Sequence, residues 1–317
     1  MTPVRPFVRP RRLRPRDRVA LISLASPSRR EDVEAGADEL RALGFEPVVM
    51  APAAPDGLPG ARYVAGPAAA RAAQLRSALG DPAIAAVVAS RGGYGSAQLL
   101  PWIDVAAIRQ AETMLVGYSD ITALLDVFTG RAGLVSIHGP MAEGRLARGG
   151  AGYDRDSFLR IVTEPVPYGV VEATGAVVLQ PGDAQGVLRG GTLTQVAALL
   201  GTPWAFAAME PTVLFLDDVN ERPYRIDRLL WQLRAAGVFA HVRGVVLNEL
   251  PGCDEPDGDV TALEAVRHAL TGIAGPIVAG VRSGHTPGPM LTLPFGVHVS
   301  LHAADDVRLS IDEPAVS

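Results

Sequence analysis

The chain has 317 residues, of which 48% are hydrophobic and 20% charged, and its formal net charge is −5 at pH 7. This length and apolar content are typical of about two globular domains with buried cores, and the acidic balance offers no basic field for nucleic acid or an anionic membrane. All 29 basic residues other than histidine are arginine, which excludes chemistry that needs a lysine amine, such as Walker phosphate loops, Schiff bases and serine–lysine hydrolysis.

Residues 1–17 are rich in arginine and proline, and we predict a disordered tail there. The apolar run Val19–Ala25 is short for a secretory signal and is followed by Pro27 and two arginines without an Ala-x-Ala cleavage site. No later run approaches the roughly 18 apolar residues that a membrane-spanning helix needs. Together with the single cysteine, Cys253, which excludes an internal disulfide, this predicts a cytoplasmic protein that is neither exported nor bound to a membrane.

From residue 18 to about 150, apolar runs alternate with helical patterns, as in a parallel sheet flanked by helices. The expected strands are Val19–Leu24, Phe45–Met50, Ile84–Ala89 and Met114–Val116, and the expected helices are Glu31–Leu43, Pro67–Leu79, Ser96–Leu100 and Ile121–Phe128. Two glycine-bearing turns, at residues 91–95 and 117–120, directly follow strands. Ligands bind at the carboxyl ends of such strands, so we predict a flavodoxin-like N-terminal α/β domain with a site at these turns.

After the glycines near residue 150 we expect a linker at 151–180, with β-rich sequence towards its end, and a second domain at 181–317. The expected elements of this domain are helices at Leu193–Leu200 and Tyr224–Ala236, strands at Val213–Leu216 and Val242–Leu247, and a half-exposed hairpin within Val297–Ile311. The whole chain is therefore predicted to be α/β, with a C-terminal domain that is β-rich and of the α+β class.

Ser119 has the strand–turn–helix context of a nucleophile elbow, with Gly117 two residues before it. Such a turn exposes the hydroxyl and points the first helical amides, beginning with that of Asp120, at the space where an oxyanion would form. Ile121 occupies the position of the last glycine in the Gly-x-Ser-x-Gly pattern. The alternative is that Ser119 or Asp120 only caps the helix.

Gly92 and Gly93 end a neighbouring strand, where backbone without a Cβ can approach a ligand closely. Either glycine can supply the second oxyanion donor. The spacing of the glycines does not fit a dinucleotide-binding loop, and the alternative is a tight turn without a ligand.

A serine nucleophile needs a base, and two of the six histidines, His138 and His285, lie among small residues suited to a site. The spacing does not choose between them. The other four lie on expected exposed strands, on a helix or in a turn without chemical neighbours, and they are His241, His268, His298 and His302. Asp217, Asp218 and Glu221 follow an apolar strand, where a carboxylate can orient an imidazole or can simply cap the next helix. The acidic cluster at 254–259 lacks the pattern of a calcium loop, so we expect no metal.

Four separated segments together resemble the LD-carboxypeptidase family of serine peptidases, which also contains the microcin C immunity peptidases. They are Arg91–Gly95, Gly117–Asp120, Leu216–Arg228, and Gly284–His285 with Leu291–Gly296. The resemblance implies that Ser119 is the nucleophile, that His285 rather than His138 is the base, and that Asp120 and a glycine of the Arg91 loop form the oxyanion hole. It also implies a site between an α/β domain and a β-rich domain, and a homodimer.

The orienting acid of the family is a glutamate, and the matching residue here is Asp217, which is shorter by one methylene. A productive site tolerates displacements of only about 0.5 Å. Either the backbone compensates, or Asp218 or Glu221 takes over, or activity is weakened. Thr192 also stands where many relatives have asparagine.

We therefore predict a serine carboxypeptidase without cofactors that releases the terminal D-alanine from a cytoplasmic murein tetrapeptide. Arg91, Tyr94 and Trp204 are the candidate substrate contacts. One alternative is a self-immunity peptidase acting on aminoacyl or peptidyl nucleotides, whose base would need an aromatic platform such as Tyr94, Trp102, Trp204 or Trp231. The other is a non-catalytic binding protein that lost its triad through the change at Asp217.

Overall fold

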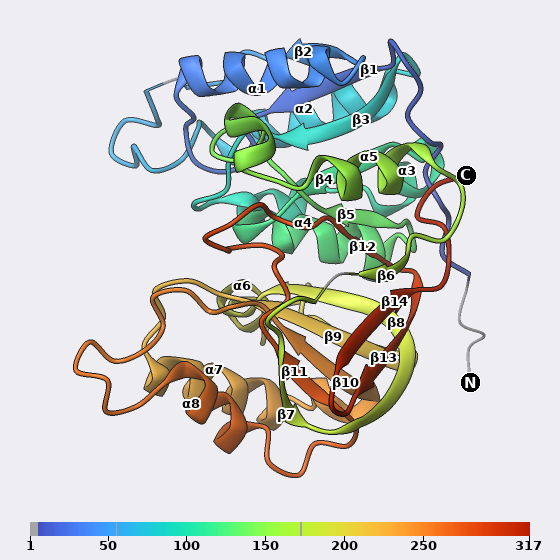
Figure 1. The fold of residues 1–317 in the computed structure, drawn as a ribbon. Helices are drawn as coiled ribbons and strands as arrows, with labels where there is room; N and C mark the ends of the chain where they lie inside the picture. Colours follow the sequence, from blue (N-terminus) through green and yellow to red (C-terminus); the bar gives the residue numbers. More distant parts are fainter. Residues whose placement is uncertain (1–5, 55, 172) are drawn as a thin grey trace.

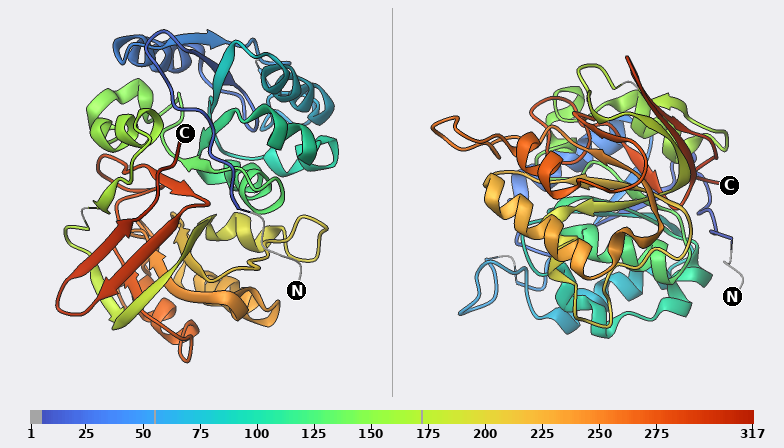
Figure 2. Two further views of the ribbon diagram at one scale, coloured as in Figure 1. Left: turned by 90° about the vertical axis from the view of Figure 1, so that its right-hand side faces the viewer. Right: turned by 90° about the horizontal axis from the view of Figure 1, so that it is seen from below.

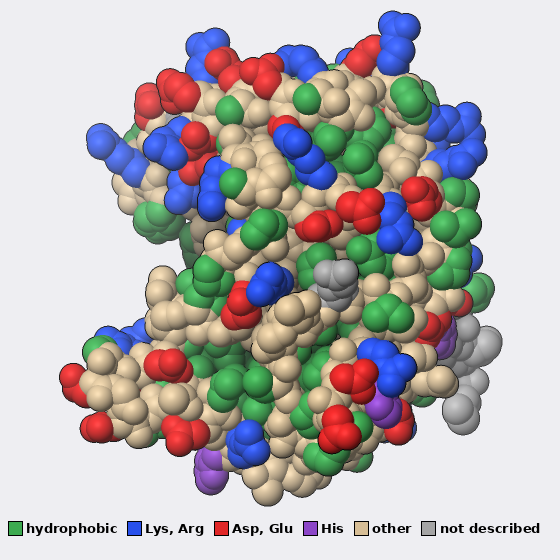
Figure 3. Space-filling view, viewed as in Figure 1, with side chains coloured by type: hydrophobic (Ala, Val, Ile, Leu, Met, Phe, Trp, Pro, Cys, Tyr) green, Lys and Arg blue, Asp and Glu red, His purple; other side chains and the backbone are tan. Residues whose placement is uncertain are grey.

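The computed structural model describes residues 6–54, 56–171 and 173–317. Two domains lie one above the other in Figure 1, and each is built around its own β-sheet. In the space-filling view a notch separates the two domains at the left edge (Figure 3). The expected combination of an N-terminal domain with a parallel sheet and a strand-rich C-terminal domain is confirmed.

The first sheet has the strand order β12-β5-β4-β3-β1-β2. Its strands are β1 (Arg18–Ile22), β2 (Glu46–Val49), β3 (Ile84–Ala89), β4 (Met114–Gly117), β5 (Ser136–His138) and β12 (Leu293–Phe295). Strands β1 to β5 are parallel, and β3, β4 and β5 are buried throughout, which explains their continuous apolar sequences. This order brings the carboxyl ends of β3 and β4 side by side.

The helices of this domain are α1 (Arg30–Ala42), α2 (Ala68–Gly80), α3 (Val105–Ala111), α4 (Thr122–Asp126) and α5 (Arg155–Thr163). Helix α3 was not predicted. It is only seven residues long, and its start is fixed by Asp104, whose carboxylate accepts two backbone amides. The segment predicted as a helix near Ser96–Leu100 is instead a 3-10 turn that contains Pro101, a residue that cannot donate a backbone hydrogen bond.

The second sheet has the order β6-β14-β13-β8-β9-β10-β11-β7. Its strands are β6 (Gly169–Val171), β7 (Val177–Gln180), β8 (Gly182–Thr192), β9 (Thr212–Asp217), β10 (Val242–Leu247), β11 (Ile277–Ala279), β13 (His298–Ala303) and β14 (Val307–Ile311). Strands β8 to β11 are parallel and the outer strands are antiparallel. Strands β13 and β14 form the hairpin that the alternating sequence predicted.

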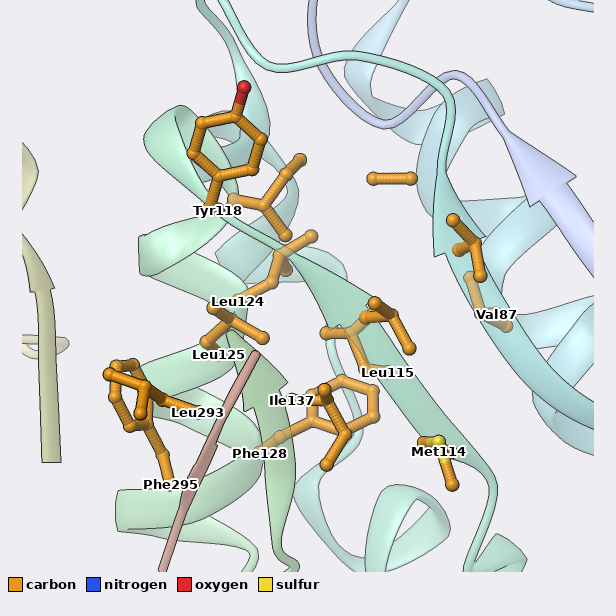
Figure 4. Close-up of a cluster of buried hydrophobic side chains, with 14 of the residues drawn as sticks. Val87, Met114, Leu115, Tyr118, Leu124, Leu125, Phe128, Ile137, Leu293 and Phe295 are labelled. Carbon is orange, nitrogen blue, oxygen red and sulfur yellow. The ribbon is translucent and has the colours of Figure 1, made fainter. Parts of the chain in front are cut away.

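Helices α6 (Leu193–Ala198), α7 (Pro223–Ala235) and α8 (Ala262–Ala269) pack on the second sheet and bury a separate cluster of apolar side chains. The other face of this sheet joins the core of the first domain. Phe215 of β9 packs 6.2 Å, ring to ring, from Phe295 of β12, which pairs with β5 of the first sheet. Figure 4 draws Leu293, Phe295 and Phe128 among the buried apolar side chains of this core. Because packed interiors resist deformation, the shared core fixes one domain against the other.

The N-terminal segment is ordered where the structure describes it, which corrects the expected disorder of residues 6–17. Val8 forms a bridge with Leu134, and Leu13 is buried and donates its amide to Val162. The amide of Arg12 also donates to the carbonyl of Ser317, so the segment around Arg12 lies beside the C-terminal end of the chain (Figure 2). Residues 1–5 of the expected tail lie outside the described residues.

The segment 151–180, expected as a linker, contains α5, β6 and β7. Helix α5 buries Phe158 and Ile161 against the first domain, and its first turn is capped by the carboxylate of Asp154. Strands β6 and β7 lie at the two edges of the second sheet. Helix α5 was not predicted, because it follows a glycine-rich stretch and its amphipathic pattern spans only nine residues.

Candidate active site

Ser119 lies in a tight turn between β4 and α4, which we call the serine turn (residues 117–120). Its φ angle is 61°, in the left-handed region that residues other than glycine seldom adopt. Strain of this kind is typical of functional turns. A Cβ on Gly117 would come within 2.8 Å of the side chain of Ile121. Ile121, which replaces the last glycine of the Gly-x-Ser-x-Gly pattern, therefore packs against Gly117, the first glycine of that pattern.

The loop after β3, which we call the glycine loop (residues 91–95), packs directly against the serine turn. A Cβ on Gly92 would lie 3.1 Å from Oγ of Ser119 and 3.4 Å from the amide nitrogen of Asp120. The amide of Gly93 follows in the next peptide unit. Gly92 therefore lies against both the hydroxyl of Ser119 and the backbone amide of Asp120.

Buried polar contacts hold the glycine loop to the serine turn. The carboxylate of Asp120 accepts the amide of Ser96 at 2.7 Å, and the carbonyl of Asp120 accepts the hydroxyl of the same serine. Burial raises the pKa of Asp120 above its ordinary value. The fully buried Arg71 donates to the carbonyl of Gly95 at 2.8 Å. The backbone amide of Asp120 thus lies at the serine turn, while its side chain holds Ser96, the residue that follows the glycine loop.

Ser119, His285 and Asp217 form one line of contacts. Nε2 of His285 lies 3.2 Å from Oγ of Ser119, and Nδ1 lies 2.5 Å from Oδ2 of Asp217. When Nδ1–H donates to the carboxylate, Nε2 is left free to accept the serine proton. Of the two candidate histidines, the structure brings His285 to Ser119 and places His138 elsewhere.

Asp217, the last residue of β9, reaches the imidazole although it is shorter than glutamate. The reason is the close approach of the loop that carries the histidine, which we call the histidine loop (residues 283–290). A Cβ on Gly284, whose φ is 71°, would lie 2.4 Å from Oδ2 of Asp217. The backbone amide of His285 donates to the same oxygen at 3.1 Å, and Thr192 donates its hydroxyl to Oδ1 at 2.8 Å.

The other two candidate acids are engaged elsewhere. Asp218 accepts the amide and the hydroxyl of Thr194 at the start of α6. Glu221 lies 3.6 Å from Arg225, one turn along at the start of α7. Neither acid contacts the imidazole, and neither caps α7 as the alternative interpretation expected, because α7 has no side-chain cap and Asp218 bonds at the start of α6 instead.

His138 ends strand β5 and is fully buried, so its expected place in a loop was wrong. Its Nδ1 lies 3.1 Å from the hydroxyl of Ser283, and its Nε2 lies 3.7 Å from Oδ1 of Asp217. Burial alone would raise the pKa of Asp217, but the imidazoles of His138 and His285 outweigh it and hold that pKa well below its ordinary range. The carboxylate therefore stays ionised while fully buried.

The imidazole of His285 is partly exposed, with 19% of its side-chain surface accessible. Burial lowers its pKa, but the hydrogen bond to Asp217 and the charge of that carboxylate exceed this effect and raise the pKa of His285 above its ordinary 6.5. A stronger base is the expected consequence of an ionised partner on Nδ1.

Sequence reasoning missed two residues that hold the histidine loop. The guanidinium of Arg145, 6% exposed, donates to the carbonyls of Gly284 and Thr286 at 2.9 Å each, which flank His285 on both sides. The buried amide of Asn248 donates to the carbonyl of His285 itself at 2.6 Å. Neither belongs to a recognisable motif, so only the three-dimensional arrangement identifies them.

The three residues predicted to contact substrate lie in different surroundings. Arg91 is exposed and donates to the carbonyl of Pro27, with Glu143 3.4 Å away. Tyr94, within the glycine loop, is half exposed. Trp204 is partly buried against the core, and no contact in the described part of the chain joins it to the serine, histidine or aspartate.

No group of three or more His, Cys, Asp or Glu residues in the described ranges has the arrangement of a metal site. The acidic loop near Asp254 instead caps α8, because Asp254 accepts the amide of Ala262. None of the described helices combines the length and apolar character needed to cross a bilayer.

Comparison with known proteins gives one consistent result. The chain matches the LD-carboxypeptidase N-terminal domain over residues 19–139 and the LD-carboxypeptidase C-terminal domain over residues 185–301. A Streptomyces coelicolor protein, named provisionally as a carboxypeptidase, is 41% identical over 99% of both chains. The murein tetrapeptide carboxypeptidase of Pseudomonas aeruginosa is 32% identical over 69% of this chain and 71% of its own.

Solved structures share the two-domain fold. The muramoyltetrapeptide carboxypeptidase from Oxalobacter formigenes superposes with a TM-score of 0.80 at 26% identity, covering 93% of this chain and 99% of the other. The microcin C7 self-immunity protein MccF, in complex with glutamyl sulfamoyl guanosine, superposes with a TM-score of 0.85 at 23% identity, covering 98% and 99%. At that identity the second likeness concerns the fold alone.

Proposed function

Because the chain belongs to the LD-carboxypeptidase family and is a serine-type carboxypeptidase, we propose that Ser119, His285 and Asp217 are its catalytic triad. The observation that carries this proposal is the continuous contact from the hydroxyl of Ser119 through the imidazole to a buried carboxylate. The alternative of a binding protein with a broken triad loses its basis, because Asp217 is in contact with the imidazole.

In the proposed reaction, Oγ of Ser119 attacks the carbonyl carbon of the terminal peptide bond while Nε2 of His285 takes its proton. The imidazolium then returns that proton to the leaving amine, and the C–N bond breaks to give an acyl-enzyme. Water, deprotonated by the same imidazole, hydrolyses the ester and restores Ser119. Asp217 holds the imidazole in the productive tautomer and stabilises its charged form throughout.

The amides of Asp120 and Gly93 are the proposed donors to the tetrahedral oxyanion. The placement of Gly92 supports this proposal, because a residue without a Cβ leaves open the space in front of Ser119. Backbone donors aimed at developing charge are preorganised, and removing one such donor typically costs about 10²- to 10³-fold in rate.

For the substrate we propose a murein tetrapeptide, from which the enzyme releases the terminal D-alanine. Relatives named for murein peptides support this choice, and one of them is 32% identical to this chain. The test is to incubate purified protein with the tetrapeptide and weigh the products. Loss of one alanine residue by the wild type but not by Ser119→Ala is the expected result.

An aminoacyl-sulfamoyl adenylate serves as the competing substrate in the same experiment, because a self-immunity protein that shares the fold is also similar in sequence, at 27% identity over 80% of this chain. Cleavage of the adenylate with no cleavage of the tetrapeptide would refute the murein assignment while leaving the triad intact. Cleavage of neither would refute the proposed substrate class altogether.

We further propose that the protein works in the cytoplasm, where murein fragments are recycled, and that it forms a homodimer. The single cysteine supports a reducing compartment. Light scattering after gel filtration tests the dimer, for which a mass near twice 33.2 kDa is expected.

A further inference from the structure

Two half-exposed tyrosines meet at the glycine loop, to which the second of them belongs. Tyr63 is 60% exposed and Tyr94 is 51% exposed, and their ring centroids lie 5.6 Å apart with planes inclined by 68°. This edge-to-face arrangement is favourable for two aromatic quadrupoles and leaves ring surface open to solvent. The pair carries no charge, so it is suited to an uncharged ring and not to the carboxylates of a peptide.

Ser26, in the loop after β1, fixes both tyrosines. Its hydroxyl donates to the carbonyl of Tyr63 at 2.7 Å and accepts the amide of Tyr94 at 3.0 Å. The loops after β1, β2 and β3 are thereby joined at the carboxyl edge of the first sheet. A surface fixed before the ligand arrives loses less entropy on binding.

The pair lies near the nucleophile. Tyr94 follows Gly92 by two residues, which allows about 7.6 Å at most between their Cα atoms, and Gly92 packs against Ser119. Tyr63 belongs to the light-blue loop that projects from the left of the upper domain in Figure 1.

We propose that Tyr63 and Tyr94 form a subsite for the sugar ring of a muramoyl peptide, an inference that rests on the proposed function. A carboxypeptidase places the carboxyl-terminal bond at Ser119, so the muramoyl group at the other end of the peptide lies three residues away. Three extended residues span about 10 Å, a length compatible with the position of Tyr94 two residues beyond Gly92, which packs against Ser119. The C–H groups on one face of a pyranose are attracted to the negative face of an aromatic ring.

The test compares kcat/KM for N-acetylmuramoyl tetrapeptide with kcat/KM for the free tetrapeptide. The ratio cancels any general effect of a substitution on folding or on the glycine loop. We expect the wild type to prefer the muramoyl substrate by about tenfold, and Tyr63→Ala and Tyr94→Ala each to reduce that preference by about three- to tenfold, chiefly through KM. Tyr63→Phe and Tyr94→Phe should retain it.

Trp102→Ala is the matched control. Trp102 is 49% exposed but lies at the end of the 3-10 turn, where its carbonyl accepts Arg76 of α2. This variant should leave the ratio unchanged. A ratio unaltered in both tyrosine-to-alanine variants would overturn the sugar subsite even if the tetrapeptide is cleaved.

Calorimetric binding of N-acetylmuramoyl tetrapeptide to Ser119→Ala provides a readout that needs no catalysis. Tyr63→Ala in that background should weaken binding by about three- to tenfold. Unchanged affinity would refute the subsite. If the tyrosine variants instead impair only hydrolysis of an aminoacyl-sulfamoyl adenylate, the rings stack on a nucleobase and the sugar assignment is wrong. Failure of the wild type to cleave any tetrapeptide would refute the proposed function and not this subsite.

Discussion

The serine turn and the histidine loop meet in one site but are held by different means. The serine turn is determined locally, by the end of β4, the start of α4 and the positive φ of Ser119. The histidine loop has little regular structure, and side chains from distant segments hold it, among them Arg145 and Asn248. The proposed nucleophile is therefore positioned mainly by the chain around it, and the proposed base mainly by long-range hydrogen bonds.

This difference predicts that substitutions in the serine turn and around the histidine loop impair activity in different ways. Changes in the serine turn should remove the chemistry itself, whereas changes around the histidine loop should misplace or retune a base that is still present. Misplacement by about 1 Å can cost 10²-fold in rate, so effects on the histidine side should be graded by how closely a residue touches the imidazole.

The largest effect on the histidine side is expected for Asp217→Asn. An amide cannot hold the imidazole in the productive tautomer, and loss of this group from a triad can cost about 10⁴-fold in kcat. Steady-state kinetics on the tetrapeptide measure the loss. Asp217→Glu should also be slow, because Gly284 and Thr192 leave no room for another methylene.

Asp218→Asn and Glu221→Gln are the matched controls, since each acid is engaged at a helix start and not with the imidazole. Both should retain activity within a few-fold of wild type. Near-normal kcat/KM in Asp217→Asn combined with a large loss in Glu221→Gln would show that Glu221 is the acid.

Gly284→Ala should lower kcat by about 10²-fold. A Cβ at this position would lie 2.4 Å from the carboxylate of Asp217, and the φ of 71° disfavours any side chain. Gly288→Ala, in the same loop but with no atom within 4 Å of an added Cβ, is the control and should be nearly silent. Equal activity of the two variants would contradict the close approach of loop and carboxylate.

Substitutions at Arg145 separate its effect on the position of the histidine loop from the effect of its charge on the pKa of His285. Arg145→Lys keeps a cation but loses the guanidinium fork, and Arg145→Gln loses both, so kcat should fall by about tenfold or more in each. The charge of Arg145 lowers the pKa of His285. The pH profile of kcat/KM should therefore shift to higher pH in Arg145→Gln and much less in Arg145→Lys. Identical profiles for the two variants would limit Arg145 to a structural role.

The smallest effect is a shift in the pH dependence of the wild type. A base must be neutral to accept the serine proton, so kcat/KM should rise with pH and level off above the pKa of His285. Because Asp217 raises that pKa, the midpoint should lie above 6.5. Residual activity of Asp217→Asn should show a lower midpoint. A wild-type midpoint clearly below 6.5 would contradict the coupling between His285 and Asp217.

The same contrast explains what the sequence could predict. Gly117, Ser119 and the helix after them are contiguous, so a strand–turn–helix pattern was sufficient to suggest the nucleophile. The local sequence indicated His285 and Asp217 only as candidates among alternatives, and the family resemblance chose between them. The structure places His285 against Ser119 and Asp217 against His285. Nothing in the local sequence marks Arg145, whose acceptors in the histidine loop lie about 140 residues away.

Strand β12 was missed for a related reason. It pairs with β5, more than 150 residues earlier, and carries the chain back into the first sheet. Its three residues follow no period long enough to indicate a strand. Tyr63 was also missed, because a single tyrosine in a proline- and glycine-rich loop gives no sign of the Ser26 contact that brings it to Tyr94.

If Ser119 and His285 are a nucleophile and its base, they act as one catalytic unit. The most direct measurement is kcat for tetrapeptide hydrolysis in Ser119→Ala, His285→Ala and the double variant. If the residues act together, each single substitution should cost roughly 10⁵- to 10⁶-fold and the double variant should be no slower than either. If the two losses multiply, or if His285→Ala retains activity within tenfold of wild type, the two residues do not form the nucleophile–base pair described here.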